Sequence, residues 1–132
     1  MKGLALIFTV LFWFSVLSSH AQEAVVRVGD IPANTFKDGK MSVEQTTRDR
    51  IIRAGKLVAR PDCEIVSYTF SLTRGDQMFG IVAVKRAVFP DKVINWLNDT
   101  KGPGIKVLFD EIKVKQDGLI RTAHPIALKY DQ

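Results

Sequence analysis

Few side chains in this sequence could do nucleophilic, acid–base or metal chemistry. After residue 21 there is one cysteine, Cys63, and one histidine, His124. Together with Asp110 they could form a Cys-His-Asp arrangement, but no glycine-flanked nucleophile surrounds Cys63 to support it. One histidine, one cysteine and no cluster of acidic residues are too few ligands to predict a metal site. The sequence therefore predicts no catalytic residue, no metal and no cofactor.

A β-hairpin near the C-terminal end carries the other candidate site. Two runs rich in β-branched residues flank Asp117-Gly118, a pattern typical of a hairpin turn. A three-residue loop ending at Gly118 would pair Val114 with Ile120. Burial of two aliphatic side chains is worth roughly 1.5–3 kcal/mol each, and one like-charge pair costs only about 0.2–1 kcal/mol. We therefore expect the three-residue loop rather than a two-residue loop.

The charged side chains of this hairpin form the predicted binding surface. In the expected register Lys113 pairs with Arg121, so Lys113, Lys115 and Arg121 share the outer face and could contact an acidic partner. A solvated face with no partner is the alternative interpretation. The strand expected at 56–60 is a second candidate, since an edge strand can accept a strand from another chain. Its flanking basic residues are equally typical of a protected edge.

In the first strand of the hairpin, the apolar residues switch from odd-numbered to even-numbered positions part-way along. Its apolar residues share one parity up to Phe109 and the opposite parity from Ile112 onward. One apolar face survives only if an extra residue is inserted near Asp110 and Glu111, which predicts a β-bulge there.

Residues 1–21 have the pattern of a secretory signal peptide. A basic start precedes an apolar run and small residues, which predicts cleavage between Ala21 and Gln22. The apolar run is about 15 residues, shorter than the ~20 that span a bilayer as a helix. An uncleaved anchor is the alternative. We expect a single domain over 22–132 that is periplasmic or secreted, with no membrane span after cleavage.

The charge pattern narrows the classes of partner. The formal net charge of the full sequence is +5, and its basic residues are scattered rather than gathered in a run. Export and scattered charge both argue against a nucleic-acid partner. Cys63, the sole cysteine, is expected to be a small buried side chain, with a disulfide between molecules as the alternative.

The remaining pattern predicts an α+β domain: a mostly antiparallel sheet, or a sandwich-like arrangement, with two short helices. The expected elements are a strand at 22–27, a loop at 31–40, a helix at 42–54, strands at 56–60, 63–73 and 78–84, a helix from Pro90 to about residue 100, and the hairpin. Ser42 and Gln45 have capping-box spacing, and Gly55 is expected to end that helix.

The two longest central strands differ in pattern. From Val66 to Thr73 apolar and polar residues alternate, which predicts one buried and one solvent-facing side. Residues 78–84 are apolar on both parities, with Gly80 in the middle, which predicts a central strand buried on both faces.

The hairpin contains a specific stretch, G-x-K-V-x-F-x-x-I-K-V at 104–114, followed by Asp117-Gly118 and Arg121. Four less specific stretches precede it, at Val28-Gly29, 39–42, 54–59 and 65–70. In this order and spacing the sequence resembles the C-terminal periplasmic domain of the gliding-motility and type IX secretion protein GldM.

The resemblance implies a non-enzymatic domain that makes protein–protein contacts in the bacterial envelope. In that family the full-length protein is anchored in the inner membrane and reaches outer-membrane partners. This sequence lacks the family's membrane anchor and preceding domains, so its energy-coupling role is not expected. The main alternative is a secreted enzyme or ligand-binding protein with a pocket near Cys63 and His124. A third hypothesis is a homo-oligomeric structural protein.

Overall fold

The computed structural model describes residues 26–34, 36–38 and 40–132. The predicted signal peptide, with its cleavage point between Ala21 and Gln22, lies outside the described residues. So does the start of the first expected strand.

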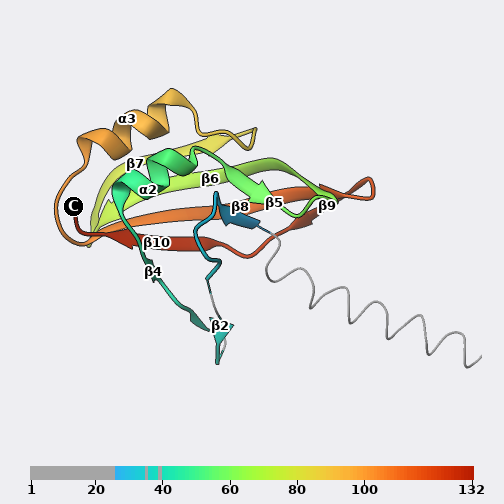
Figure 1. Cartoon of the computed structure of the whole chain (residues 1–132), viewed down its shortest axis with the longest axis horizontal. Helices are drawn as coiled ribbons and strands as arrows, with labels where there is room; N and C mark the ends of the chain where they lie inside the picture. The colour runs from blue at the N-terminus through green and yellow to red at the C-terminus, as the bar shows by residue number, and fades with distance from the viewer. Residues whose placement is uncertain (1–25, 35, 39) are drawn as a thin grey trace, which may run out of the picture.

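The longest strands form the middle of one large sheet (Figure 1). Its order is β4-β10-β8-β6-β7, and β9 pairs with the far half of β8. The strands are β4 (Glu44–Gln45), β6 (Cys63–Arg74), β7 (Gln77–Val84), β8 (Ile105–Gln116), β9 (Leu119–Thr122) and β10 (Ile126–Tyr130). All pairs are antiparallel except β10 with β4. With the two helices, this arrangement confirms the predicted α+β class.

One face of the sheet carries the core. Over it lie α2 (Arg48–Ala54), α3 (Asp91–Asp99) and a small ribbon in which β1 (Val26–Val28) pairs with β5 (Leu57–Ala59) (Figure 1). Side chains from these elements and from the inner face of the sheet form one hydrophobic cluster. Phe109 lies in it, with its ring centroid 5.5 Å from those of Phe70 and Phe89. The opposite face of the sheet carries mostly polar or exposed side chains, with Ala127 of β10 as a buried exception.

The predicted bulge is confirmed in β8. Ser67 of β6 pairs with Lys113, but Thr69, only two residues further along β6, pairs with Asp110. The extra β8 residue is accommodated by Glu111, whose φ is +49°. The insertion turns both Phe109 and Ile112 toward the core, where each is fully buried. Strand β6 has an irregularity of its own between Ile65 and Ser67, so that Ile65 rather than the expected Val66 packs against the core.

The predicted three-residue hairpin loop is wrong: the loop has two residues. Asp117 and Gly118 have φ values of +51° and +78°, and Val114 pairs with Arg121. Two positive φ values are typical of a type I′ turn, whose twist matches that of the strands it connects. Val114 is 3% exposed because β6 and the core cover it, so its burial never depended on Ile120. A longer loop would therefore gain no burial of Val114.

Replacement of Gly118 by alanine tests this turn. A Cβ at Gly118 meets nothing within 4 Å, so only its positive φ opposes the substitution. A non-glycine residue in the left-handed region costs about 1–2 kcal/mol, and we expect that loss in the free energy of unfolding measured by urea titration. Asp117→Asn is the matched control and should be neutral, since asparagine suits a type I′ turn. An unchanged stability of Gly118→Ala would contradict the turn assignment.

The first helix begins later than predicted. Its N-cap is Thr47, whose Oγ1 accepts a hydrogen bond from the N–H of Arg50 at 3.2 Å. Ser42 instead donates to the carboxylate of Glu44. Residues 44 and 45 form β4, because the edge of β10 offers them a parallel partner. The predicted end at Gly55 is confirmed, with φ +68°.

Other boundaries also differ from the expectations. The loop expected at 31–40 contains a short hairpin of β2 (Phe36–Lys37) and β3 (Lys40–Met41). Pro90 is the N-cap of α3 rather than its first residue. Strand β5 pairs with β1 in a two-stranded ribbon, and the start of its other side is covered by residues 87–89, through bonds to Leu57 N–H and to the C=O of Gly55 just before the strand. The role of this strand as an acceptor for another chain stays a prediction.

Strand β7 is the edge of the main sheet and not a central strand, so that prediction is wrong. Its outer face is open, with Met78 54% and Ile81 59% exposed. Gly80 is required because α3 packs directly against it, and not because the strand is buried between two layers. A Cβ there would lie 2.7 Å from the ring of Trp96 in α3, so the helix rests directly on the strand backbone.

Candidate functional site

The β8–β9 hairpin lies at one end of the sheet, away from the C-terminus (Figure 1). Its two faces follow from the pairing register. Lys113 pairs with Thr122 and Lys115 with Ile120, which places these four side chains on one face. Arg121 pairs with Val114 and therefore lies on the opposite face. The prediction that Lys113, Lys115 and Arg121 share one face is thus wrong for Arg121, because the two-residue loop shifts β9 by one position. The binding role of Lys113 and Lys115 stays a prediction.

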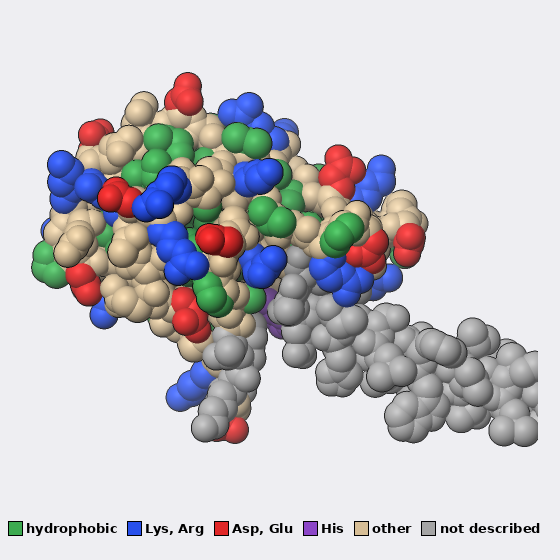
Figure 2. Space-filling model, viewed as in Figure 1, with side chains coloured by type: hydrophobic (Ala, Val, Ile, Leu, Met, Phe, Trp, Pro, Cys, Tyr) green, Lys and Arg blue, Asp and Glu red, His purple; other side chains and the backbone are tan. Residues whose placement is uncertain are grey.

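The two remaining lysines have neighbours that moderate their charge. Lys113 Nζ donates to Thr122 Oγ1 at 2.7 Å. Lys115 lies opposite Glu64 of β6, a cross-strand pair of opposite charges. Basic and acidic side chains are also interspersed over the molecular face shown in Figure 2. The hairpin therefore presents individual lysines and not an intense basic patch.

An exposed aliphatic pair is the feature that sequence reasoning missed. Leu119 is 58% and Ile120 56% exposed, directly after the turn. The three-residue loop had placed Ile120 in the core, and so concealed it. The Asp117-Gly118 dipeptide was the available signal, since it is a preferred pair for a two-residue turn. We call Lys113, Lys115, Leu119 and Ile120 the hairpin tip.

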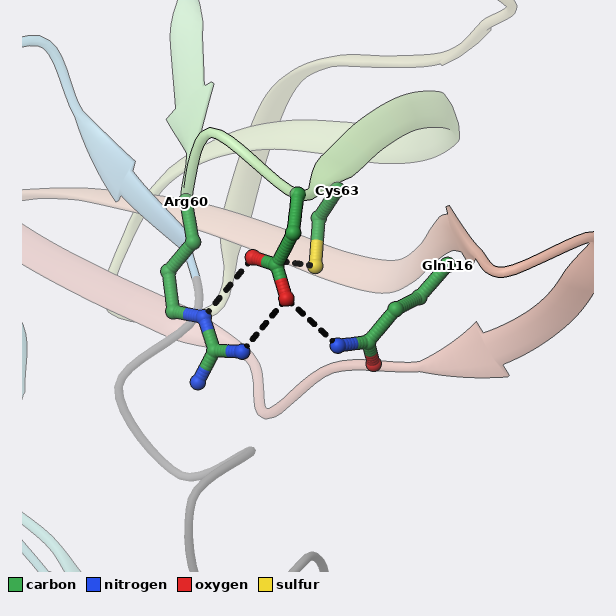
Figure 3. A network of polar contacts seen from close by, with 4 residues as sticks. Arg60, Cys63 and Gln116 are labelled. Carbon is green, nitrogen blue, oxygen red and sulfur yellow. Dashed lines mark hydrogen bonds and ion pairs between the residues drawn. The ribbon is translucent and has the colours of Figure 1, made fainter.

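A polar network next to the turn of the hairpin holds it against the β5–β6 corner (Figure 3). Arg60 donates to both carboxylate oxygens of Asp62, from Nε at 3.1 Å and from Nη2 at 2.8 Å. Gln116, the last residue of β8, donates to Asp62 from Nε2 at 2.8 Å. These donors hold the pKa of Asp62 well below its usual range, the bond from Arg60 having the largest effect. The network positions the tip and leaves little acceptor capacity for a ligand.

Cys63 lies in the same network in a setting that disfavours its thiolate. Its Sγ is 3.7 Å from Asp62 Oδ1. Burial raises the pKa of the Cys63 thiol, and the charge of Asp62 raises it further. A nucleophilic cysteine requires the opposite shift.

The structure does not bring Cys63 and His124 together. Cys63 pairs with Gln116, whereas His124 follows Ala123, whose N–H bonds to the carbonyl of Ile112. Ile112 and Gln116 are four positions apart in β8, which corresponds to about 13 Å along the strand. The geometry thus gives no support to a Cys-His-Asp arrangement or to a shared pocket at these residues.

The alkylation rate of Cys63 checks the thiol assignment. Since the thiolate is the reactive form, a raised pKa predicts slower reaction with iodoacetamide near neutral pH than that of a free cysteine peptide. As the pH is raised, the alkylation rate of Cys63 should increase at a higher pH than the rate of the peptide does. Asp62→Asn removes a negative charge and an acceptor while Arg60 remains, so it should shift that profile back to lower pH. An unchanged profile in this variant would contradict the role of Asp62.

A surface hollow of about 640 Å³ adjoins the polar network at Arg60. It is lined by Arg27, Pro32, Ala33, Val58, Ala59, Arg60 and Pro61. Within 26–34, 36–38 and 40–132, no three histidine, cysteine or acidic residues are grouped so as to hold a metal ion.

No protein-family model and no curated protein matches this chain in sequence. Of the two helices in the described part of the chain, neither has the length and apolar character needed to cross a membrane.

Proposed function

We propose that this chain is an exported, non-enzymatic protein-interaction module of the bacterial cell envelope, and that the hairpin tip is its contact surface. The observation that carries the proposal is the exposure of Ile120, 56%, on the hairpin face that it shares with Lys113 and Lys115. Leu119, 58% exposed, lies next to it in the chain on the other face of the hairpin. Exposed apolar surface rimmed by polar groups marks interaction sites.

The chemistry of the hairpin tip defines the kind of partner. Protein interfaces have an apolar centre and a polar rim, and here Ile120 would form the centre on the lysine face, with Leu119 on the other face of the hairpin. Lys115 and Lys113 would form a basic rim, which suits an acidic surface on the partner. The network of Arg60, Asp62 and Gln116 holds the hairpin beside its turn, so that little conformational entropy is lost when a partner binds.

Export and the envelope setting are inferred from the sequence. The pattern of residues 1–21 supports a periplasmic or secreted location, and the resemblance to the GldM C-terminal domain supports an association with gliding-motility or type IX secretion components. The raised pKa of Cys63 disfavours only a catalysis that would use this cysteine as a nucleophile. The intact mass of the protein purified from cells expressing the full chain tests cleavage after Ala21.

Site-specific crosslinking tests the contact surface. A photo-reactive amino acid would replace Leu119 in the full chain, expressed in the cells that naturally make it. Illumination of intact cells should yield an adduct with one envelope protein. The same probe at Asn95, an exposed position on α3, is the control. Failure to crosslink at Leu119, or the same adduct from Asn95, would refute the hairpin tip as the contact.

Binding to the purified partner then gives the quantitative test. The double variant Leu119→Ser, Ile120→Ser should weaken binding by roughly tenfold or more, equivalent to about 1.4 kcal/mol. Val43→Ser removes another exposed aliphatic side chain, 46% exposed, and should leave affinity unchanged. Equal losses in both variants would point to a general effect of surface hydrophobicity.

A further inference from the structure

Strand β7 has an open edge on the main sheet. It pairs with β6 on one side and ends the strand order on the other. Among the described residues, no hydrogen bond outside the β6 ladder reaches the backbone of residues 77–84. The outward N–H and C=O groups of this strand are therefore available to another strand.

The composition of β7 lacks the usual protection of an edge. Its eight residues include no charged residue and no proline. Met78 and Ile81 are 54% and 59% exposed. One protective feature is present, a register shift where Leu72 and Thr73 pair with Gly80 and Met78. It lies close to the β6–β7 turn, and the five residues from Gly80 to Val84 keep a regular register.

Charges of opposite sign flank the neutral strand. Asp76 precedes it, and Lys85 and Arg86 follow it; all three are exposed. In an antiparallel pair of two such strands centred on Ile81, Asp76 faces Arg86 of the other copy. A parallel pair would instead place Asp76 beside Asp76 and the basic residues beside each other.

We propose that two copies of this chain associate through antiparallel pairing of their β7 strands, which makes the main sheet continuous across a two-fold axis. The partner is a second copy because the complementary charges belong to one chain, at opposite ends of one strand. Two-fold symmetry uses each acidic–basic contact twice. When the two-fold axis lies at Ile81, the exposed Ile81 side chains of the two copies also lie against each other. This interface is distinct from the hairpin tip, and goes beyond the function proposed above.

Complementary charge reversal tests the pairing. Sedimentation equilibrium of the protein expressed from the full chain should give twice the monomer mass at high concentration. Asp76→Lys creates like-charge contacts at both ends of the interface, and Lys85→Glu with Arg86→Glu does so with the opposite sign. Each variant alone should raise the dissociation constant by at least about tenfold. An equimolar mixture should recover the dimer, since a mixed pair has opposite charges at both ends.

Two further variants separate the interface from general effects. Ile81→Lys places a charge against its own copy in the Ile81-centred register and should give a monomer. Ile120→Lys, at the hairpin tip, makes a similar change at a 56% exposed position and should leave the dimer intact. Circular dichroism confirms that each variant is folded. A wild-type monomer at every concentration, an unchanged dissociation constant in the charge variants, or no recovery on mixing would each overturn the proposal.

Discussion

Replacement of Phe109 by alanine is expected to lower the free energy of unfolding by about 3–5 kcal/mol. Phe109 is fully buried at the point where β8 begins its bulge. Its ring centroid lies 5.8 Å from that of Tyr68, 5.5 Å from that of Phe70 and 5.5 Å from that of Phe89. Truncation would remove the transfer energy of the ring and leave a cavity that three large side chains cannot close. Urea-induced unfolding measures the loss.

The control for Phe109 is another phenylalanine in the same sheet. Phe79 is partly exposed, with the Arg74 guanidinium 5.6 Å from its ring centroid. Phe79→Ala should therefore cost clearly less than Phe109→Ala. If Phe109→Ala does not fold, Phe109→Leu retains part of the buried volume and should give a measurable intermediate loss. Equal losses at positions 79 and 109 would show that the aromatic cluster is not the centre of the core.

Replacement of Asn34 by alanine is expected to cost at least about 2 kcal/mol, since each buried backbone group left without a partner costs about 1–3 kcal/mol. Asn34 lies beside β10 and acts there as a strand neighbour would. Its Nδ2 donates to the carbonyl of Ala127 at 2.8 Å, and its Oδ1 accepts from the N–H of Ala127 at 3.0 Å. Ala127 is fully buried, and Asn34 also donates to the carbonyl of Ser42.

Hydrogen exchange distinguishes this role from a general loss of stability. In Asn34→Ala the amide of Ala127 should exchange faster than that of Ile112, which lies in the same sheet. Asn34→Asp would turn a carboxylate oxygen toward the carbonyls of Ala127 and Ser42, so it should cost at least as much stability as Asn34→Ala. Asn98→Ala, at an exposed position on α3, is the control and should be close to neutral. Retained protection at Ala127 in Asn34→Ala would contradict the assignment.

The candidate site could be predicted only in part. Lys113 and Lys115 do share an exposed hairpin face, because residues two apart on a strand always do. The expected three-residue loop misplaces Arg121 and Ile120 because it relies on the hairpin partner to bury Val114. Strand β6, far away in the sequence, buries it instead. The network of Arg60, Asp62 and Gln116 joins segments 54 residues apart, and only its Arg60–Asp62 part has a local spacing that could have suggested it.

The sequence by itself determined the features that depend on near neighbours in the chain. Alternation predicted β6, and the parity change at Phe109 and Ile112 predicted the bulge in β8. Gly55 predicted the end of α2. Each follows from which residues share a face, or from which residue tolerates a positive φ, and neither property needs knowledge of the partner strand.

The tertiary structure alone decided the features that depend on what packs against a segment. Residues 78–84 are apolar on both parities, yet β7 is an edge, because strand order is set by long-range pairing. Gly80 is explained by Trp96 of α3, and the late start of α2 by the edge of β10 that captures residues 44 and 45. The physical reason is common to all three. Burial and backbone hydrogen bonds are satisfied by whichever surface is nearest in space, and local sequence does not specify that surface.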